Sequence, residues 1–387
     1  MTYSGNCRLG DVFKNRREKG RPGLPTLSVT INDGIVNRDD LDRKQETNLT
    51  PQQHLLAKPN DIAYNMMRMW QGAFGLVRHE GLVSPAYVVL SPKKNVDPLF
   101  ASYYFKSPRA IYLFWAYSHG LTEDRLRLYY DDFSRIPATL PSISRQRTVA
   151  KLLEAWDRGL EIAKRLLAAS KKQKLALMQQ LLYPAIGKVR ESNGWLDVRL
   201  EALFSERSEM GFQNLPLLSI TKDGGVLLRS ELSDKDVSSV DKSKYRRICP
   251  GDIGYNTMRM WQGISAFSSV EGIVSPAYTI VTPNERIDGH FAAQLFKFDP
   301  VVFQFYRYSQ GLVSDTWNLN FRDFSLIKLR IPDIDEQLRI VRTLDSADSV
   351  IANLDTLVGH LEVEKRSLMQ RLLHDAEAPN LKSADGK

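Results

Sequence analysis

A short polar motif carries side chains well suited to contacting nucleic acid. It holds Asn65, Arg68, Trp70 and Gln71, and Gly72 follows as a turn signal. An arginine can bridge O6 and N7 of guanine, and an asparagine or glutamine can bridge N6 and N7 of adenine. A tryptophan can support the arginine or pack against a base. These residues therefore form a candidate DNA-contacting site.

The same motif occurs a second time, with identical spacing. This copy holds Asn256, Arg259, Trp261 and Gln262. A structural interpretation stays open, because the methionines and tryptophan of the motif could pack in a core while the arginine caps carbonyl groups. In that case the repetition would preserve the fold and not a site.

Another repeated motif is Ser84-Pro85-Ala86-Tyr87. It resembles the Ser/Asn-Pro-Pro-Tyr loop with which amino-methyltransferases grip a flipped base, but alanine replaces the second proline in both copies. A methyltransferase also needs a glycine-rich loop after a strand to bind S-adenosylmethionine, and none is visible. A structural strand entry, with proline fixing the backbone, is the favoured alternative. The candidate DNA-contacting set nevertheless also includes Ser84, Tyr87, Ser118 and their counterparts Ser275, Tyr278 and Ser309.

Several kinds of chemistry lack their sequence signals. There is no Gly-x-x-x-x-Gly-Lys-Ser/Thr loop for a P-loop ATPase and no Cys-x-x-Cys for a zinc finger. None of the six histidines recurs in both copies of the repeat described next. Asp42-Arg43-Lys44 has the look of a nuclease metal site, but Ser233 replaces its carboxylate in the other copy. We therefore expect no catalytic residue, no metal and no cofactor in this chain.

Both polar motifs belong to a tandem duplication with an offset of 191 residues. Residues 64–92 and 255–283 share 16 of 29 positions. The register holds from Arg8-Leu9, matched by Arg199-Leu200, to Asp132-Phe133, matched by 323–324. A period this long corresponds to whole domains and not to a solenoid repeat.

Each half begins with a segment that mixes strand-like runs and turn residues. Residues 87–90 and 278–281 are strand-like, and short helices are expected near 97–104 and 108–117. Residues 73–79 differ from 264–270 at all seven positions, which predicts either a variable hairpin or a tolerant loop. The fold class predicted for each of these segments is a compact α+β domain.

A long segment follows each domain and predicts a coiled-coil helix. Residues 145–182 and 336–373 contain no proline, and their apolar residues follow a 4-3 heptad spacing interrupted at Lys174 and Lys365. A helix over 145–182 would span roughly 57 Å at 1.5 Å per residue. The residues expected at the helix–helix or partner interface are Leu153, Trp156, Leu160, Leu167, Leu177, Leu181, Leu344, Ile351, Leu354, Val358, Leu368 and Leu372.

Charge and composition bound the remaining function classes. The net charge is +8, and residues 145–182 alone carry nine Lys/Arg against three Asp/Glu. Most of the excess positive charge thus lies on this one segment. It can form a solvated helix face, or it can face the second helix, DNA or a partner subunit, so the overall charge is weak evidence for DNA binding. The apolar runs are too short to cross a bilayer, and no signal peptide is visible. We expect a cytoplasmic protein with no membrane partner.

The order of these elements resembles the specificity (S) subunits of type I restriction–modification systems. Both long helices open with Pro-x-x-x-x-Gln, at Pro141 to Gln146 and Pro332 to Gln337. Both end in Leu-Met-Gln-x-Leu-Leu, from residues 177 and 368. The Trp-Gln-Gly and Val-Ser-Pro-Ala-Tyr elements also resemble those of the family's target recognition domains. The resemblance extends to about residue 375.

This resemblance implies a specific fold and role. It implies a non-catalytic chain with two similar α+β target recognition domains, separated by two long antiparallel coiled-coil helices in a pseudo-two-fold repeat. Each domain would bind one half of a bipartite sequence in double-stranded DNA. The helices would dock two methyltransferase (M) subunits, which bind S-adenosylmethionine, and motor-nuclease (R) subunits, which use ATP, would join them.

Domain boundaries and alternative functions complete the expectations. We expect recognition domains at 1–140 and 185–331, spacer helices at 141–184 and 332–375, and a disordered tail at 376–387. One alternative is a free-standing bipartite DNA-binding regulator. A DNA adenine methyltransferase is a second alternative, disfavoured by the missing cofactor loop.

Overall fold

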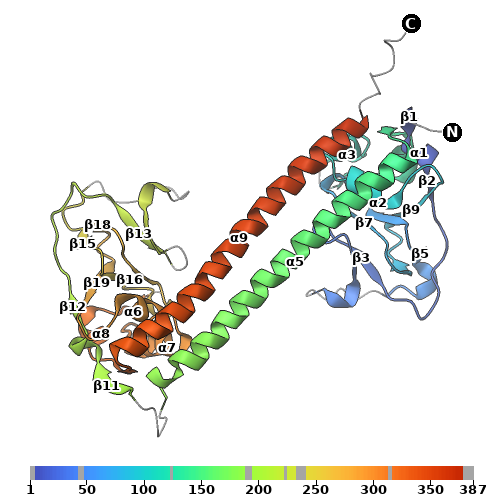
Figure 1. Cartoon of the computed structure of the whole chain (residues 1–387). Helices are drawn as coiled ribbons and strands as arrows, with labels where there is room; N and C mark the ends of the chain where they lie inside the picture. Colours follow the sequence, from blue (N-terminus) through green and yellow to red (C-terminus); the bar gives the residue numbers. More distant parts are fainter. Residues whose placement is uncertain are drawn as a thin grey trace. The chain divides into compact units, whose positions relative to one another are not determined.

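The computed structural model of the chain describes residues 5–41, 48–122, 125–187, 194–221, 225–231, 241–312 and 316–377. These residues fall into two compact units, one made of Met1–Lys164 and Leu357–Lys387 and the other of Arg165–Thr356. Each unit contains one domain and parts of two long helices (Figure 1). The Asp42 and Ser233 segments lie outside the described residues, as does most of the expected tail.

An antiparallel four-stranded sheet forms the centre of the first domain, in the order β2-β9-β6-β7. Its strands are β2 (Phe13–Asn15), β6 (Ile62–Asn65), β7 (Phe74–Leu76) and β9 (Tyr87–Pro92). The strands of the two-stranded sheets are β1 (Gly5–Arg8) with β10 (Pro137–Leu140), β3 (Leu27–Val29) with β4 (Ile35–Asn37), and β5 (Leu55–Ala57) with β8 (Gly81–Val83). The helices are α1 (Leu9–Val12), α2 (Pro98–Tyr104), α3 (Pro108–Ala116) and α4 (Tyr130–Arg135), with short 3-10 helices η1 (Arg38–Asp40), η2 (Pro51–Gln53) and η3 (Met69–Gln71).

The second domain repeats this plan with the 191-residue offset. Its central sheet has the order β12-β19-β16-β17, with β12 (Phe204–Glu206), β16 (Ile253–Asn256), β17 (Ser265–Phe267) and β19 (Tyr278–Pro283). The other strand pairs are β11 (Leu196–Arg199) with β20 (Lys328–Ile331), β13 (Leu218–Thr221) with β14 (Gly225–Leu228), and β15 (Arg246–Ile248) with β18 (Gly272–Val274). The helices are α6 (Gly289–Leu295), α7 (Asp299–Tyr308) and α8 (Phe321–Ser325), with η6 (Leu200–Ala202), η7 (Arg229–Glu231) and η8 (Met260–Gln262). The short 3-10 helix η5 (Tyr183–Ala185) lies between the two domains in sequence.

Aromatic side chains fill the equivalent cores. In the first domain Phe105 meets Phe114 edge to face, with ring centroids 5.3 Å apart, and the second domain repeats this contact with Phe296 and Phe305 at 5.3 Å. All four rings are fully buried. Edge-to-face packing suits the quadrupole of aromatic rings, so these rings fix how the helices sit on the central sheet in each domain.

Each domain continues into one long helix, α5 (Ile143–Leu182) or α9 (Ile334–Glu377). In each unit the two helices run antiparallel. In the first unit Asp157 pairs with Lys365, and Lys164 pairs with Glu362 at 2.5 Å. In the second unit Lys174 pairs with Asp348 at 2.6 Å. The mixed fold class with two α+β domains and long antiparallel helices is confirmed.

A buried glutamine attaches each long helix to its own domain. Gln146 accepts a hydrogen bond from the backbone N–H of Asp97 at 2.8 Å and donates to the carbonyl of Pro141 at 2.8 Å. Gln337 makes the equivalent bonds, at 2.8 Å to the N–H of Asp288 and 2.9 Å to the carbonyl of Pro332. The glutamine of the Pro-x-x-x-x-Gln motif therefore fixes the first turn of the helix.

Most of the residues expected at the helix–helix or partner interface are only half-buried. Leu153 and Leu344 are fully buried, and the other ten are partly exposed. Leu177 and Leu181 pack against the core cluster of the second unit, and Leu368 and Leu372 against that of the first. The ends of the helices thus belong to the domain cores.

Candidate nucleic-acid interface

The repeated polar loop is held in shape by two of its own predicted site residues. The Oδ1 atom of Asn65 accepts a hydrogen bond from the N–H of Met67 at 2.9 Å, and the indole N–H of Trp70 donates to the carbonyl of Met67 at 3.1 Å. Gly72 ends the loop at φ 88°, a left-handed conformation that favours glycine. The side chains of Asn65 and Trp70 therefore hold the loop backbone.

The second copy has the same geometry. Asn256 accepts from the N–H of Met258 at 3.0 Å, and Trp261 donates to the carbonyl of Met258 at 3.0 Å. Gly263 has φ 76°. Two loops that differ at one position in nine are thus built by the same bonds, which is the arrangement that a rigid recognition loop needs.

Arg68 and Gln71 project from the first loop, and Arg259 and Gln262 from the second. All four side chains are exposed. Among the residues that the structure describes, none of the four side chains has a hydrogen-bond or ion-pair partner. A guanidinium and an amide without internal partners remain available to a ligand that presents hydrogen-bond acceptors and donors.

The Val-Ser-Pro-Ala-Tyr element lies against the polar loop. The N–H of Met66 donates to the carbonyl of Ala86 at 3.4 Å, and the N–H of Thr257 donates to that of Ala277 at 2.9 Å. The Ser84 hydroxyl accepts from the N–H of Ala86 at 3.2 Å. The backbone therefore brings together the two motifs that recur in sequence.

The remaining predicted site residues have local bonds of their own. The Ser275 hydroxyl accepts from the N–H of Ala277 at 3.4 Å, as Ser84 does in the first copy. Ser118 and Ser309 donate to the carbonyls of residues four positions earlier, at 2.6 Å and 2.8 Å. Tyr87 and Tyr278 are half-buried against apolar clusters. The four serines therefore bond the backbone of a nearby loop or helix end.

A further segment touches the polar loop and was missed in the sequence. The N–H of Leu128 donates to the carbonyl of Met66 at 2.9 Å, and the N–H of Leu319 donates to that of Thr257 at 2.9 Å. Both leucines are fully buried. The two leucines are separated by the 191-residue repeat offset, so an alignment of the two copies could have identified them from the sequence.

The segment 73–79 contains a short strand, and most of it is buried. It contains β7, and Ala73, Phe74 and Val77 are each 1% exposed. In the second copy Ser265 is fully buried as well. Most of the differences between the copies here are therefore buried, whereas Arg78 and His79 and their counterparts Ser269 and Val270 are exposed. The interpretation of the segment as a variable hairpin or a tolerant loop is thus wrong for its buried part.

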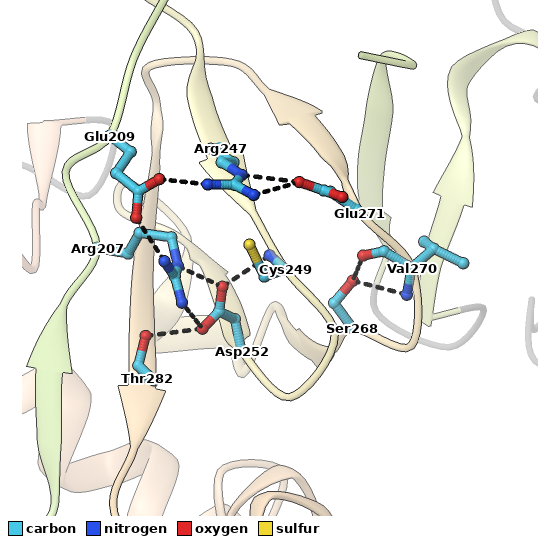
Figure 2. Close-up of polar contacts among 9 residues, drawn as sticks. All are labelled: Arg207, Glu209, Arg247, Cys249, Asp252, Ser268, Val270, Glu271 and Thr282. Atoms are coloured by element: carbon cyan, nitrogen blue, oxygen red, sulfur yellow. Dashed lines mark hydrogen bonds and ion pairs between the residues drawn. The ribbon is translucent and has the colours of Figure 1, made fainter. Parts of the chain in front are cut away.

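A buried ion pair supports the sheet in each domain. Arg207 contacts Asp252 at 2.7 Å, and Arg16 contacts Asp61 at 2.7 Å; the aspartate side chains are 1% and 2% exposed. Figure 2 shows that Asp252 also accepts from the N–H of Cys249 and from Thr282. Each buried carboxylate is therefore satisfied, as burial of a charge requires.

The electrostatics of this network are those of structural ion pairs. The pKa of Glu209 is lowered by hydrogen bonds from Arg247 and then from Arg207. Burial raises the pKa of the Cys249 thiol. In the described part of the chain no group of histidine, cysteine or acidic residues is arranged to hold a metal ion. Nor does any described helix have the length and apolar character to span a membrane.

Comparison with known proteins supports the fold. No family model matches the sequence, and a search of curated proteins finds no match. The HsdS subunit from Thermoanaerobacter tengcongensis has 15% identity and a TM-score of 0.50, with 97% of each chain covered. The S subunit of a type I restriction–modification system from M. genitalium has 13% identity and a TM-score of 0.57, with 95% of each chain covered. The chain has the fold of an HsdS specificity subunit.

A third similar structure comes from work on complex assembly and conformational transition of a type I R-M system. It has 16% identity and a TM-score of 0.55, and the match covers 97% of this chain and 98% of that one. The resemblance noted in the sequence is thus confirmed at the level of the fold, including both domains and the long helices.

Proposed function

We propose that this chain is the non-catalytic DNA-recognition subunit of a type I restriction–modification complex. The main support is a pair of exposed side chains that recurs in the two similar domains of an HsdS fold. The pair is Arg68 with Gln71 in the first domain and Arg259 with Gln262 in the second, and none of these side chains has a partner among the described residues. Each domain binds one half of a bipartite target in double-stranded DNA. The side chains supply hydrogen bonds to base edges, and the loop bonds described above keep them in position.

The long helices provide the scaffold in this proposal. They hold the two domains apart and bind two methyltransferase subunits. S-adenosylmethionine is bound by those subunits, and ATP by the motor-nuclease subunits that join them. The continuous helices α5 and α9, each attached to its own domain by a buried glutamine, support this role.

Mapping of methylated bases in the native host tests the proposal. Deletion of the gene should abolish methylation at one bipartite motif, and the chain should co-purify with a methyltransferase. A free-standing regulator would change no methylated motif. Tight binding of S-adenosylmethionine to the purified chain would favour a methyltransferase and contradict the proposal.

The loop arginines give a sharper test. Arg68→Ala and Arg259→Ala should each weaken binding to the target by about 1–3 kcal/mol, with the loss concentrated in one half-site, if the side chains contact base edges. A phosphate contact would instead lower affinity for all sequences and reduce the salt dependence. Melting temperatures should stay at the wild-type value, because neither side chain has a described internal partner. A variant that melts early and binds all duplexes poorly would make the arginines structural.

A further inference from the structure

Exposed residues that differ between the two domains form a backbone bridge close to the repeated loop in each copy. A backbone bridge pairs His119 with Arg127 in the first domain, and Gln310 with Asn318 in the second. The next residue in each case, Leu128 or Leu319, is the buried leucine bonded to the polar loop. The same backbone frame therefore places Arg127 and Asn318 at equivalent points beside that loop.

These two side chains have no role in holding the segment together. Both are exposed, and among the described residues neither side chain has a hydrogen-bond or ion-pair partner. Asn320 differs in this respect, because its Oδ1 accepts from the N–H of Asp323 at 3.0 Å and begins α8. Arg127 and Asn318 thus combine a fixed backbone position with an uncommitted polar side chain.

A hollow in the second domain shows what lies beside Asn318. It has a volume of about 460 Å³, and Asn318 lines it together with Met258, Pro276 and Ala277 from the two repeated motifs. The residues of the hollow that have identical counterparts in the first domain are these last three. The other eight differ, including Asn318, Thr257 and Arg322, which correspond to Arg127, Met66 and Asp131. The hollow therefore combines residues that are identical in the two domains with residues whose side chains differ between them.

We propose that Arg127 and Asn318 are specificity-determining residues for the two half-sites. Arg127 selects guanine, whose O6 and N7 it can bridge, and Asn318 selects adenine through N6 and N7. The repeated Arg-Gln pair contacts the bases that the half-sites have in common, and these two residues contact bases at which they differ. This inference rests on the function proposed above, because it assumes that each domain contacts one half-site.

Reciprocal exchange in the native host tests the inference. The chromosomal gene is replaced by Arg127→Asn or by Asn318→Arg, and methylated motifs are mapped across the genome. Arg127→Asn should change one position of one half-site from guanine to adenine, and Asn318→Arg should change one position of the other half-site from adenine to guanine. Either single exchange should make the two half-sites more alike.

A matched control is the exchange Lys94→Glu with Glu285→Lys. These equivalent residues are also exposed and also differ between the copies. They follow the ends of β9 and β19 that lie away from the repeated loop. The control should leave both half-sites unchanged. Melting curves of the purified complexes show whether each variant folds. If an exchange variant does not fold, the milder substitution Arg127→Lys or Asn318→Gln is used in its place.

The outcomes separate the two proposals. A wild-type bipartite motif that every folded variant leaves unchanged would overturn the assignment of Arg127 and Asn318 and leave the proposed function standing. A change in both half-sites from one exchange would also overturn the assignment. If no methylated motif depends on the wild-type gene, the proposed function fails, and this inference fails with it.

Discussion

The two domains share their backbone plan but stabilise one equivalent strand pair in different ways. In the second domain, β15 carries Arg247, which pairs with Glu209 at 2.7 Å and with Glu271 at 2.5 Å (Figure 2). Its guanidinium also lies 4.7 Å from the ring centroid of Phe212. In the first domain the equivalent residue of β5 is Leu56, which is 6% exposed. An ionic cluster in one copy thus replaces apolar burial in the other.

This difference shows which interactions the fold depends on. The strand pairing is unchanged, because Leu56 is opposite Leu82 and Arg247 is opposite Ile273 in the same antiparallel register. The glutamine at the start of each long helix makes the same bonds in both copies. The attachment of helix to domain is therefore shared by the two copies, whereas the side chains on this strand are replaceable.

The largest effect is expected where the domains are most alike. Leu153→Ala and Leu344→Ala remove equivalent, fully buried side chains, so each should reduce the free energy of unfolding by about 2–5 kcal/mol. Chemical unfolding of the two variants measures this. Leu152→Ala is the control, because Leu152 is 42% exposed. The two helix attachments would not be equivalent if Leu153→Ala and Leu344→Ala lost markedly different amounts of stability. The same would follow if Leu152→Ala lost as much stability as they do.

Loss of the buried glutamines should have the next largest effect. Gln146→Ala leaves the N–H of Asp97 and the carbonyl of Pro141 without their partner, and Gln337→Ala does the same in the second domain. An unsatisfied buried group costs about 1–3 kcal/mol, and both variants should lose stability by similar amounts in thermal unfolding. Gln173→Ala, at an exposed position of α5, should melt as the wild type does. Wild-type melting of Gln146→Ala would refute the proposed attachment.

The smallest effect is expected where the domains differ. Arg247→Leu installs the residue type of the first domain and removes the main cause of the lowered pKa of Glu209. A lowered carboxyl pKa contributes stability above its unfolded value of about 4.3, and that contribution is lost as the pH falls through the folded value. Relative to Arg247→Leu, the wild-type protein should therefore lose melting temperature on acidification below about pH 5.

Arg21→Leu is the matched control for that comparison. Arg21 pairs at 2.7 Å with Glu80, the counterpart of Glu271, but its side chain is 63% exposed. Because exposed pairs contribute little, this change should leave the acid dependence of melting nearly unaltered. Identical acid profiles for the wild type and Arg247→Leu would mean that the cluster in the second domain contributes nothing measurable to stability.

The repeat offset made much of the fold predictable. Strands near Tyr87 and Tyr278 and helices near residues 98 and 108 followed from local pattern alone. The ion pairs between the antiparallel helices could also have been predicted from the sequence. Lys174 and Lys365 are separated by the repeat offset of 191 residues, and so are their partners Asp348 and Asp157. Combined with antiparallel helices, that offset puts each heptad-breaking lysine opposite an aspartate.

Side-chain direction within the site was not predictable from spacing. Asn65 and Arg68 are three residues apart, yet the Asn65 side chain bonds the loop backbone and the Arg68 side chain projects outward. The reason is a turn between them, in which the N–H of Arg68 donates to the carbonyl of Asn65 at 3.0 Å. Residues 73–79 were interpreted as either a variable hairpin or a tolerant loop because they differ between the copies at all seven positions. Sequence difference does not distinguish an exposed loop from a repacked core strand, and Phe74 belongs to the core.

The glutamine at the start of each long helix also fixes a rotational phase. In an α-helix each residue turns the chain by about 100° and advances it by about 1.5 Å. A helix whose first turn is bonded to its domain cannot absorb an added residue by spinning in place. One residue inserted within α5 would therefore turn the part of the helix that follows by about 100°, whereas seven would nearly restore the phase and lengthen the helix by about 10 Å. Because of this attachment, the number of residues in the helix determines the rotational orientation of its far end as well as the distance of that end from the first turn.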